Sequence, residues 1–112
     1  MSPQTYASCM EACMRCALAC HHCSTACLAE EDVKPMARCI ALDMDCAAVC
    51  ELAAAAMARG SENAHALCRL CAQICELCGD ECGKHDMSHC QTCAQECRAC
   101  AAECLRMQAT AA

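Results

Sequence analysis

Residues 9–27 read CMEACMRCALACHHCSTAC, with cysteines at Cys9, Cys13, Cys16, Cys20, Cys23 and Cys27. The steps between these cysteines alternate between four and three residues. Such steps average about 3.5 residues, which places every thiol on one face of an α-helix, whereas a β-strand would scatter the thiols over both faces. Cysteine therefore occupies the positions at which a bundle helix ordinarily carries leucine or isoleucine.

The same spacing recurs further along the chain. Residues 68–82 read CRLCAQICELCGDEC and residues 90–104 read CQTCAQECRACAAEC, while a sparser copy has cysteines at Cys39, Cys46 and Cys50. In that copy, Met36, Asp43, Ala53 and Met57 fill the missing steps in phase. The four stripes hold all the cysteines, here called the Cys ladder: Cys9, Cys13, Cys16, Cys20, Cys23, Cys27, Cys39, Cys46, Cys50, Cys68, Cys71, Cys75, Cys78, Cys82, Cys90, Cys93, Cys97, Cys100 and Cys104.

Four stripes predict four helices, over about residues 3–28, 33–59, 62–82 and 87–108. Ser2 is a candidate cap of the first helix, and Pro3 and Pro35 lie in the first turns of the first two helices. Gly60 and Gly83 follow the ends of the second and third. Because the connections are short, the sequence predicts one all-α domain over residues 1–112, an antiparallel up-down-up-down four-helix bundle with a Cys-lined core. Pairing the turns predicts flat layers of side chains, for example Cys16 with Cys50, Cys71 and Cys100, or Cys23 with Asp43, Cys78 and Cys93.

The two ends of this predicted bundle differ in chemistry. Tyr6, Met57, Ala64 and Met107 would fill one end, here called the closed end. At the other end, Met36, His85, Met87 and His89 would gather around two turns, and this group is here called the mouth. Thioether and imidazole bind soft metals less strongly than thiolate does, so the mouth is a candidate route for loading and release.

Composition excludes several classes of function. The net charge is −6, with no basic run and one aromatic residue, which argues against binding to nucleic acid. No apolar run is long enough to span a membrane, and residues 1–5 do not begin an export signal, so the sequence predicts a cytoplasmic protein if Met1 is its natural start. No catalytic triad, phosphate-binding loop or open three-ligand metal site is visible, which indicates a protein that is not an enzyme.

Dense cysteine in a cytoplasmic chain points to metal or redox chemistry rather than to disulfides. The cysteine count of 19 is odd, and thiols three or four residues apart on one helix are poorly placed for disulfide geometry. Thiolates favour Cu(I), Zn(II), Cd(II) or iron–sulfur clusters. A zinc tetrathiolate carries a charge of about −2 that a narrow apolar core would oppose, whereas Cu(I) with one thiolate per ion is neutral.

This constellation resembles the bacterial copper storage proteins, and the resemblance covers essentially the whole chain. It implies a four-helix bundle that binds many Cu(I) ions, about one per cysteine, in its core, and it implies a homotetramer. The absence of an export signal is similar to the cytosolic branch of that family. Storage of this kind would keep copper from harmful redox cycling, with a copper chaperone or chelator as donor or acceptor. The alternatives are a zinc or cadmium thiolate buffer, a thiol redox protein and an iron–sulfur protein.

Several polar residues leave two interpretations open. Asp43 is either protonated and hydrogen-bonded in the core or a metal ligand, because an unpaired buried carboxylate is costly. His85 and His89 are either a solvated helix start or transient Cu(I) ligands together with Met36 and Met87. His21, His22 and His65 lie out of phase with the thiols, so we expect them to be flank or surface residues.

Overall fold

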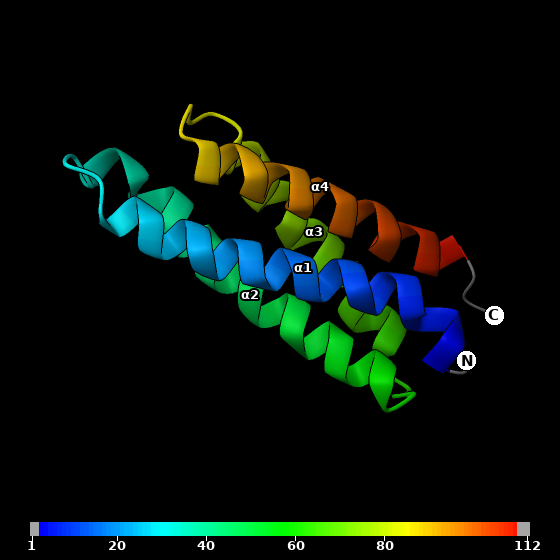
Figure 1. The fold of residues 1–112 in the computed structure, drawn as a ribbon. Helices are drawn as coiled ribbons and strands as arrows, with labels where there is room; N and C mark the ends of the chain where they lie inside the picture. Colours follow the sequence, from blue (N-terminus) through cyan, green and yellow to red (C-terminus); the bar gives the residue numbers. More distant parts are fainter. Residues whose placement is uncertain (1–2, 110–112) are drawn as a thin grey trace.

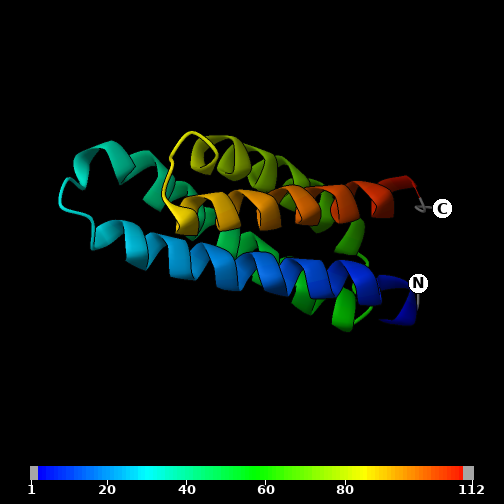
Figure 2. The ribbon, with the colours of Figure 1, turned by 45° about the horizontal axis from the view of Figure 1, so that its top comes forward.

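The structure, a computed structural model, describes residues 3–109, with side chains from residue 5 onward. It contains four long helices, α1 (Pro3–Leu28), α2 (Ala37–Ala58), α3 (Ala64–Cys82) and α4 (Ser88–Ala109), and one short 3-10 helix, η1 (Lys34–Met36). Figure 1 and Figure 2 show them as an elongated antiparallel bundle, whose principal extents are 48 × 20 × 17 Å. The predicted all-α four-helix bundle is confirmed. The predicted cap at Ser2 lies outside the described residues.

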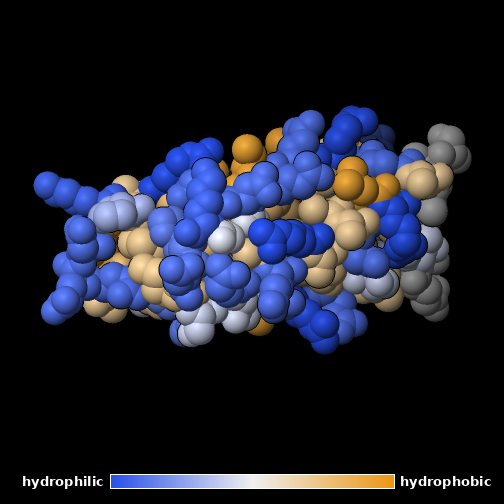
Figure 3. Space-filling model, turned by 90° about the horizontal axis from the view of Figure 1, so that it is seen from above, coloured by the Kyte–Doolittle hydropathy of each residue, from blue (hydrophilic) through white to orange (hydrophobic). Residues whose placement is uncertain are grey.

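Each long helix packs mainly against two neighbours, so that the bundle closes as a square. Helix α1 packs against α2 and α4, and α3 packs against the same two helices. The α1–η1 and α3–α4 connections lie at one end, and the α2–α3 turn lies at the other (Figure 1, Figure 2). A single seam along the bundle axis therefore receives one face from every helix. Figure 3 shows one outer face, on which hydrophilic side chains predominate.

The second helix begins later than the sequence predicted. Just after its expected start at residue 33 the chain forms η1 instead, and the Met36 N–H donates to the Val33 carbonyl over 2.9 Å. Proline has no N–H to donate and its φ angle is fixed, so Pro35 suits this tight turn, and the α-helix starts only at Ala37. Met36 nevertheless stays in phase with the core and is 1% exposed.

The turn between α2 and α3 explains why α3 also begins later than predicted. Gly60 has a φ of 65°, in the left-handed region that favours glycine. Its N–H donates to the Met57 carbonyl, and the Ser61 N–H donates to the Ala56 carbonyl. The Ser61 hydroxyl then accepts from the Asn63 N–H over 3.1 Å, so α3 starts at residue 64 rather than 62. Similarly, α4 starts at Ser88 rather than at residue 87.

Close packing of α3 against α4 depends on a missing side chain at Gly79. A Cβ atom there would lie 3.3 Å from the Cβ of Cys97 and 3.6 Å from the carbonyl of Ala94. We expect Gly79→Val to reduce the free energy of unfolding by about 2 kcal/mol, because its γ-carbons would push against the α4 backbone. Urea unfolding followed by circular dichroism measures this change.

Gly83→Ala is the matched control for this substitution. The Cβ added at Gly83 would chiefly meet the guanidinium end of Arg98, which is flexible and can move into solvent. We expect a change within about 0.5 kcal/mol. Equal losses for Gly79→Val and Gly83→Ala would contradict the close-packing explanation.

Candidate metal site

The Cys ladder lines the whole core of the bundle. Each of its nineteen cysteines is 0% exposed, and all of them are free thiols. Helix α1 contributes six thiols, α2 three, α3 five and α4 five, because the four-and-three spacing turns each stripe toward the common seam. A column of sulfur therefore replaces the branched aliphatic side chains of an ordinary bundle.

Contacts between thiols join neighbouring helices along this column. The closest pair is Cys39 and Cys82, whose Sγ atoms are 3.3 Å apart. In the middle of the bundle, Sγ of Cys46 lies 3.5 Å from that of Cys75 and 3.6 Å from that of Cys16. At these distances the Sγ atoms are in contact, so the thiols form one connected network rather than isolated pairs.

The flat layers predicted from the sequence are only partly correct for α1. The Sγ of Cys16 lies within 4.8 Å of that of Cys50, as expected, but its nearest partners are Cys46 at 3.6 Å and Cys97 at 3.7 Å, which belong to the next predicted layer. The thiols of α1 are axially staggered between those of the other helices. Interdigitation of this kind is the usual packing in bundles, because side chains fit into the spaces between residues of a facing helix.

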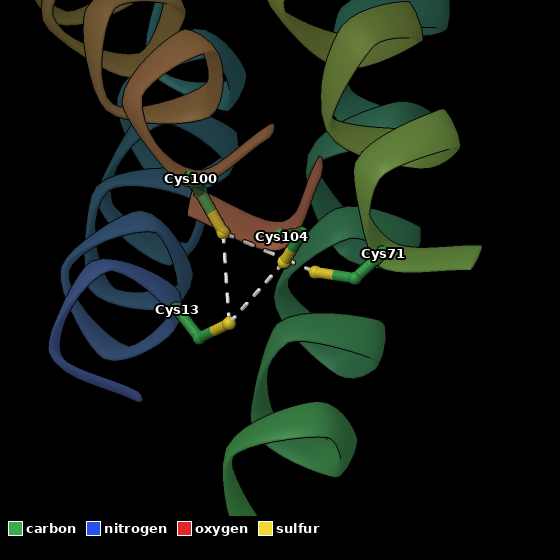
Figure 4. Close-up of side chains that lie close together, drawn as sticks. All are labelled: Cys13, Cys71, Cys100 and Cys104. Atoms are coloured by element: carbon green, nitrogen blue, oxygen red, sulfur yellow. Dashed lines mark hydrogen bonds between the residues drawn. The ribbon is translucent and has the colours of Figure 1, made fainter. Parts of the chain in front are cut away.

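Groups of four thiols recur at several levels of the core. Figure 4 shows one of them, in which Cys13 of α1, Cys71 of α3, and Cys100 and Cys104 of α4 point toward one another. The Sγ atoms in each such group lie within 4.8 Å of one another. The groups share members: Cys16 belongs to two of them and Cys20 belongs to two. A metal bound at one level would therefore share sulfur ligands with a metal bound at the next.

Asp43 is the one carboxylate inside the ladder among the described residues, and it is 0% exposed. Its Oδ1 accepts hydrogen bonds from Cys78 and Cys93, each over 3.2 Å, and from Cys82 over 3.4 Å. Burial, and next the nearby Cys93, raise the pKa of Asp43 to about 8. The inward position predicted for Asp43 is therefore correct, and its oxygen has thiol partners from both α3 and α4.

The mouth residues lie at the end with the α1–η1 and α3–α4 connections: Met36 ends η1, His85 and Met87 belong to the α3–α4 connection, and His89 lies in the first turn of α4. Met36 is buried and Met87 packs half-buried against the core. The side chains of His85 and His89 are 16% and 14% exposed, so the interpretation as a solvated helix start is wrong. Nε2 of His85 lies 2.9 Å from Glu81, whereas Nε2 of His89 has no hydrogen-bond partner among the described residues.

His85 lies near the first thiols of the ladder. Hydrogen bonds from Cys23 and Cys82 lower the pKa of the Cys39 thiol, and the positive charge of His85, when its ring is protonated, adds to this effect. At the same end, burial raises the pKa of Cys27 and of Cys90. Thiols that stay protonated to higher pH must lose their protons when a metal binds, so loading is coupled to proton release.

Glu81 was missed by the sequence reasoning. Its side chain is buried beside the mouth, where it contacts Arg38, Lys84 and His85. The signal was present, because Glu81 lies three residues after Cys78 and directly before Cys82, so its helical phase places it at the border of the thiol stripe.

The closed end is apolar, as the sequence predicted. Tyr6, Met57, Ala64 and Met107 are all buried. His65 lies at the flank of the stripe, as expected, but its ring is half-buried and meets Tyr6 edge-on, with the ring centroids 6.3 Å apart. His21 and His22 are exposed as expected, and Nε2 of His21 lies 2.9 Å from Oε1 of Glu51.

Comparisons with known proteins agree with this geometry. The sequence model of the family described as copper storage protein matches residues 2–109. An uncharacterized cysteine-rich protein of Bacillus subtilis, YhjQ, is 50% identical over 83 residues, which cover 74% of this chain and 77% of that protein. In the described part of the chain, none of the helices has the length and apolar character needed to cross a membrane.

Solved structures match over nearly the full chain. The Cu(I)-bound copper storage protein BsCsp3 is 48% identical, with a TM-score of 0.89 that covers 92% of this chain and 97% of that one. A cytosolic copper storage protein from Streptomyces lividans, solved with five coppers, is 40% identical, with a TM-score of 0.94 and coverage of 98% and 97%. With its thiol-lined bundle and these matches, the chain belongs to the copper storage protein family.

Proposed function

We propose that the protein stores Cu(I) by binding about one ion per cysteine along the Cys ladder, and that it thereby buffers and detoxifies copper. The observation that carries this proposal is the charge balance of the core. In the described part of the chain, the buried charged side chains are Asp43 and Glu81, both acidic. No buried Lys or Arg there offsets thiolate charge, so the bound metal itself has to neutralise the thiolates.

Charge neutrality favours Cu(I) over Zn(II). One Cu(I) per thiolate leaves the core neutral, whereas each tetrahedral zinc tetrathiolate would leave about two negative charges in it. The shared thiol groups also suit an ion that accepts bridging sulfur ligands, and thiolate is a soft ligand that Cu(I) prefers. Separate zinc sites would instead require groups of four cysteines with no common member.

The mouth supplies the route in this proposal. Met36, His85, Met87 and His89 would pass Cu(I) to the first thiols, Asp43 would meet it one step deeper, and a copper chaperone or chelator would act as donor and acceptor. The cytosolic copper storage protein from Streptomyces lividans, at 40% identity, supports a cytosolic storage role rather than an enzymatic one. Leu70 and Leu77 on α3 are 44% and 49% exposed, which supports a homo-oligomer, and the family resemblance suggests a tetramer.

An anaerobic titration of the reduced protein tests this function. Cu(I) is added against a competing chelator, the titration is repeated with Zn(II), and helicity and proton release are followed throughout. We expect uptake of about one Cu(I) per thiol and release of about one proton per thiolate formed. The helical signal should barely change, because the thiols already face one another before the metal arrives.

Two outcomes would contradict the proposal. Uptake that stops at four or five ions, with equal competition by Zn(II), would indicate a generic thiolate buffer for zinc or cadmium. Release of no protons at fixed pH would show that the buried thiols are not the ligands.

A further inference from the structure

Glu81 lies at the centre of a charged cluster beside the mouth. Its side chain is 9% exposed, and it comes from the last turn of α3. Its Oε1 accepts from Nη1 of Arg38 over 2.7 Å and lies 3.5 Å from Nζ of Lys84. Its Oε2 lies 2.9 Å from Nε2 of His85. The two carboxylate oxygens therefore have separate partners, Arg38 on α2 and His85 in the α3–α4 connection.

This arrangement determines which nitrogen of His85 carries hydrogen. Two cations contact Glu81, Arg38 at 2.7 Å and Lys84 at 3.5 Å, so the group is an ionised carboxylate. An ionised carboxylate only accepts hydrogen bonds, so Nε2 of His85 is the donor. In the neutral ring, Nδ1 then keeps its lone pair and is free to bind a metal.

Gln91 on α4 holds the backbone of the α3–α4 connection in place. The side-chain amide of Gln91 donates to the carbonyl of His85 over 2.7 Å and to that of Gly83 over 3.2 Å. His89 differs from His85, since its Nε2 lies 3.7 Å from Glu30, too far for a hydrogen bond. The ring of His85 is therefore held by a hydrogen bond, whereas Nε2 of His89 has no hydrogen-bond partner among the described residues.

We propose that Glu81 is a positioning residue for copper loading: it fixes His85 as the Nε2–H tautomer, so that Nδ1 is presented to incoming Cu(I). This inference rests on the proposed function, because it concerns the route by which Cu(I) reaches the Cys ladder. Carboxylate partners of metal-binding histidines commonly set the ring orientation and tautomer in this way. Arg38 donates a hydrogen bond to the other carboxylate oxygen, Oε1, and this contact keeps Oε2 of Glu81 directed at His85.

Glu81→Gln is the test variant, because it preserves shape while replacing one acceptor with a donor. The amide oxygen can still accept from Arg38, so the amide NH₂ faces His85 and donates to Nε2. The hydrogen of the ring then moves to Nδ1, where it blocks the proposed ligand atom. We expect nitrogen NMR of the metal-free protein to show this change of tautomer. We also expect stopped-flow loading from a Cu(I)–chelator complex to slow by about tenfold, with unchanged final capacity.

Two further variants separate positioning from general structural support. His85→Ala should slow loading at least as much, and the double variant Glu81→Gln/His85→Ala should be no slower than His85→Ala alone, since Glu81 acts through His85. Glu51→Gln is the matched control. It alters the exposed pair of Glu51 with His21, also 2.9 Å apart, and should load at the wild-type rate.

The outcomes distinguish this inference from the function on which it rests. Slow loading by His85→Ala together with wild-type loading or an unchanged tautomer in Glu81→Gln would overturn the role of Glu81 alone. An additive effect in the double variant would do the same, because it would mean that Glu81 acts independently of His85. Wild-type loading by His85→Ala would overturn both the route and the role of Glu81, while a low final capacity of the wild-type protein would refute the storage function itself.

Discussion

The copper-loaded protein is expected to resist urea at concentrations that fully unfold the metal-free protein. A ligand that binds only the folded state stabilises it by mass action, by about 2.7 kcal/mol for one site at a hundredfold excess of free ligand over the dissociation constant. Domains of this kind have total stabilities of about 5–15 kcal/mol. A few filled sites in the Cys ladder would therefore exceed the intrinsic stability of the bundle, and filling the column should remove the unfolding transition altogether.

Urea titration under anaerobic, reducing conditions measures this effect, with the helical circular dichroism signal as the probe. The control is the same sample after a strong Cu(I) chelator has removed the metal, which should return to the metal-free curve. Partial loading should give intermediate midpoints, because copper binding and folding are linked. If the fully loaded and metal-free proteins unfolded at the same urea concentration, the ions would have to lie outside the core, for example at the surface histidines His21 and His22.

The helices and the lining of the core could be predicted because their signal is periodic and redundant. Four stripes keep one phase over their whole length, and even the gaps in the second stripe are filled by residues that the structure buries, such as Met36, Asp43 and Met57. Thiols are small and apolar enough to pack in these positions. The phase of a helix thus determined which side chains face inward.

Axial position could not be predicted in the same way. Helical phase gives the direction of a side chain around its own axis, but not the height at which two helices meet. The contacts of Cys16 with Cys46 and Cys97 depend on a stagger of α1 that arises from packing between helices. The late start of α2 has a local cause instead, because Pro35 favours a 3-10 turn that the four-and-three pattern does not reveal.

Side-chain contacts between residues far apart in the chain could not be predicted from the sequence either. Glu81 and Arg38 are 43 positions apart, and only the α2–α3 contact explains why this carboxylate is buried. Likewise, His65 is next to the in-phase Ala64, but its ring reaches Tyr6 on α1. Such residues at the borders of a stripe can turn either to solvent or to a neighbouring helix, and the choice depends on tertiary packing.

The metal-free protein is expected to lose stability as the pH rises from about 4 to about 8, and Asp43→Asn is expected to lose much less. Burial, and next the nearby Cys93, raise the pKa of Asp43 in the folded protein to about 8 from an ordinary 3.8. Between these values the folded state binds a proton at Asp43 that the unfolded state releases. The contribution is therefore fully present below about pH 4 and is lost as the pH rises through about 8.

The expected loss attributable to Asp43 is about 5 kcal/mol, since each pKa unit corresponds to about 1.4 kcal/mol. Asparagine has a similar shape and cannot ionise, so the difference between the two proteins isolates this carboxyl group from the thiols of Cys78, Cys82 and Cys93 around it. Urea unfolding of the reduced, metal-free proteins at several pH values measures it, with Asp45→Asn, exposed on the same helix, as the control. Parallel stability curves for wild-type and Asp43→Asn would show that Asp43 is charged in the folded core. The thiol hydrogen bonds to Oδ1 would then have to stabilise a carboxylate that no buried cation in the described core neutralises. Divergent curves would show that the Asp43 carboxyl group stays protonated in the folded, metal-free core until a rise in pH removes its proton.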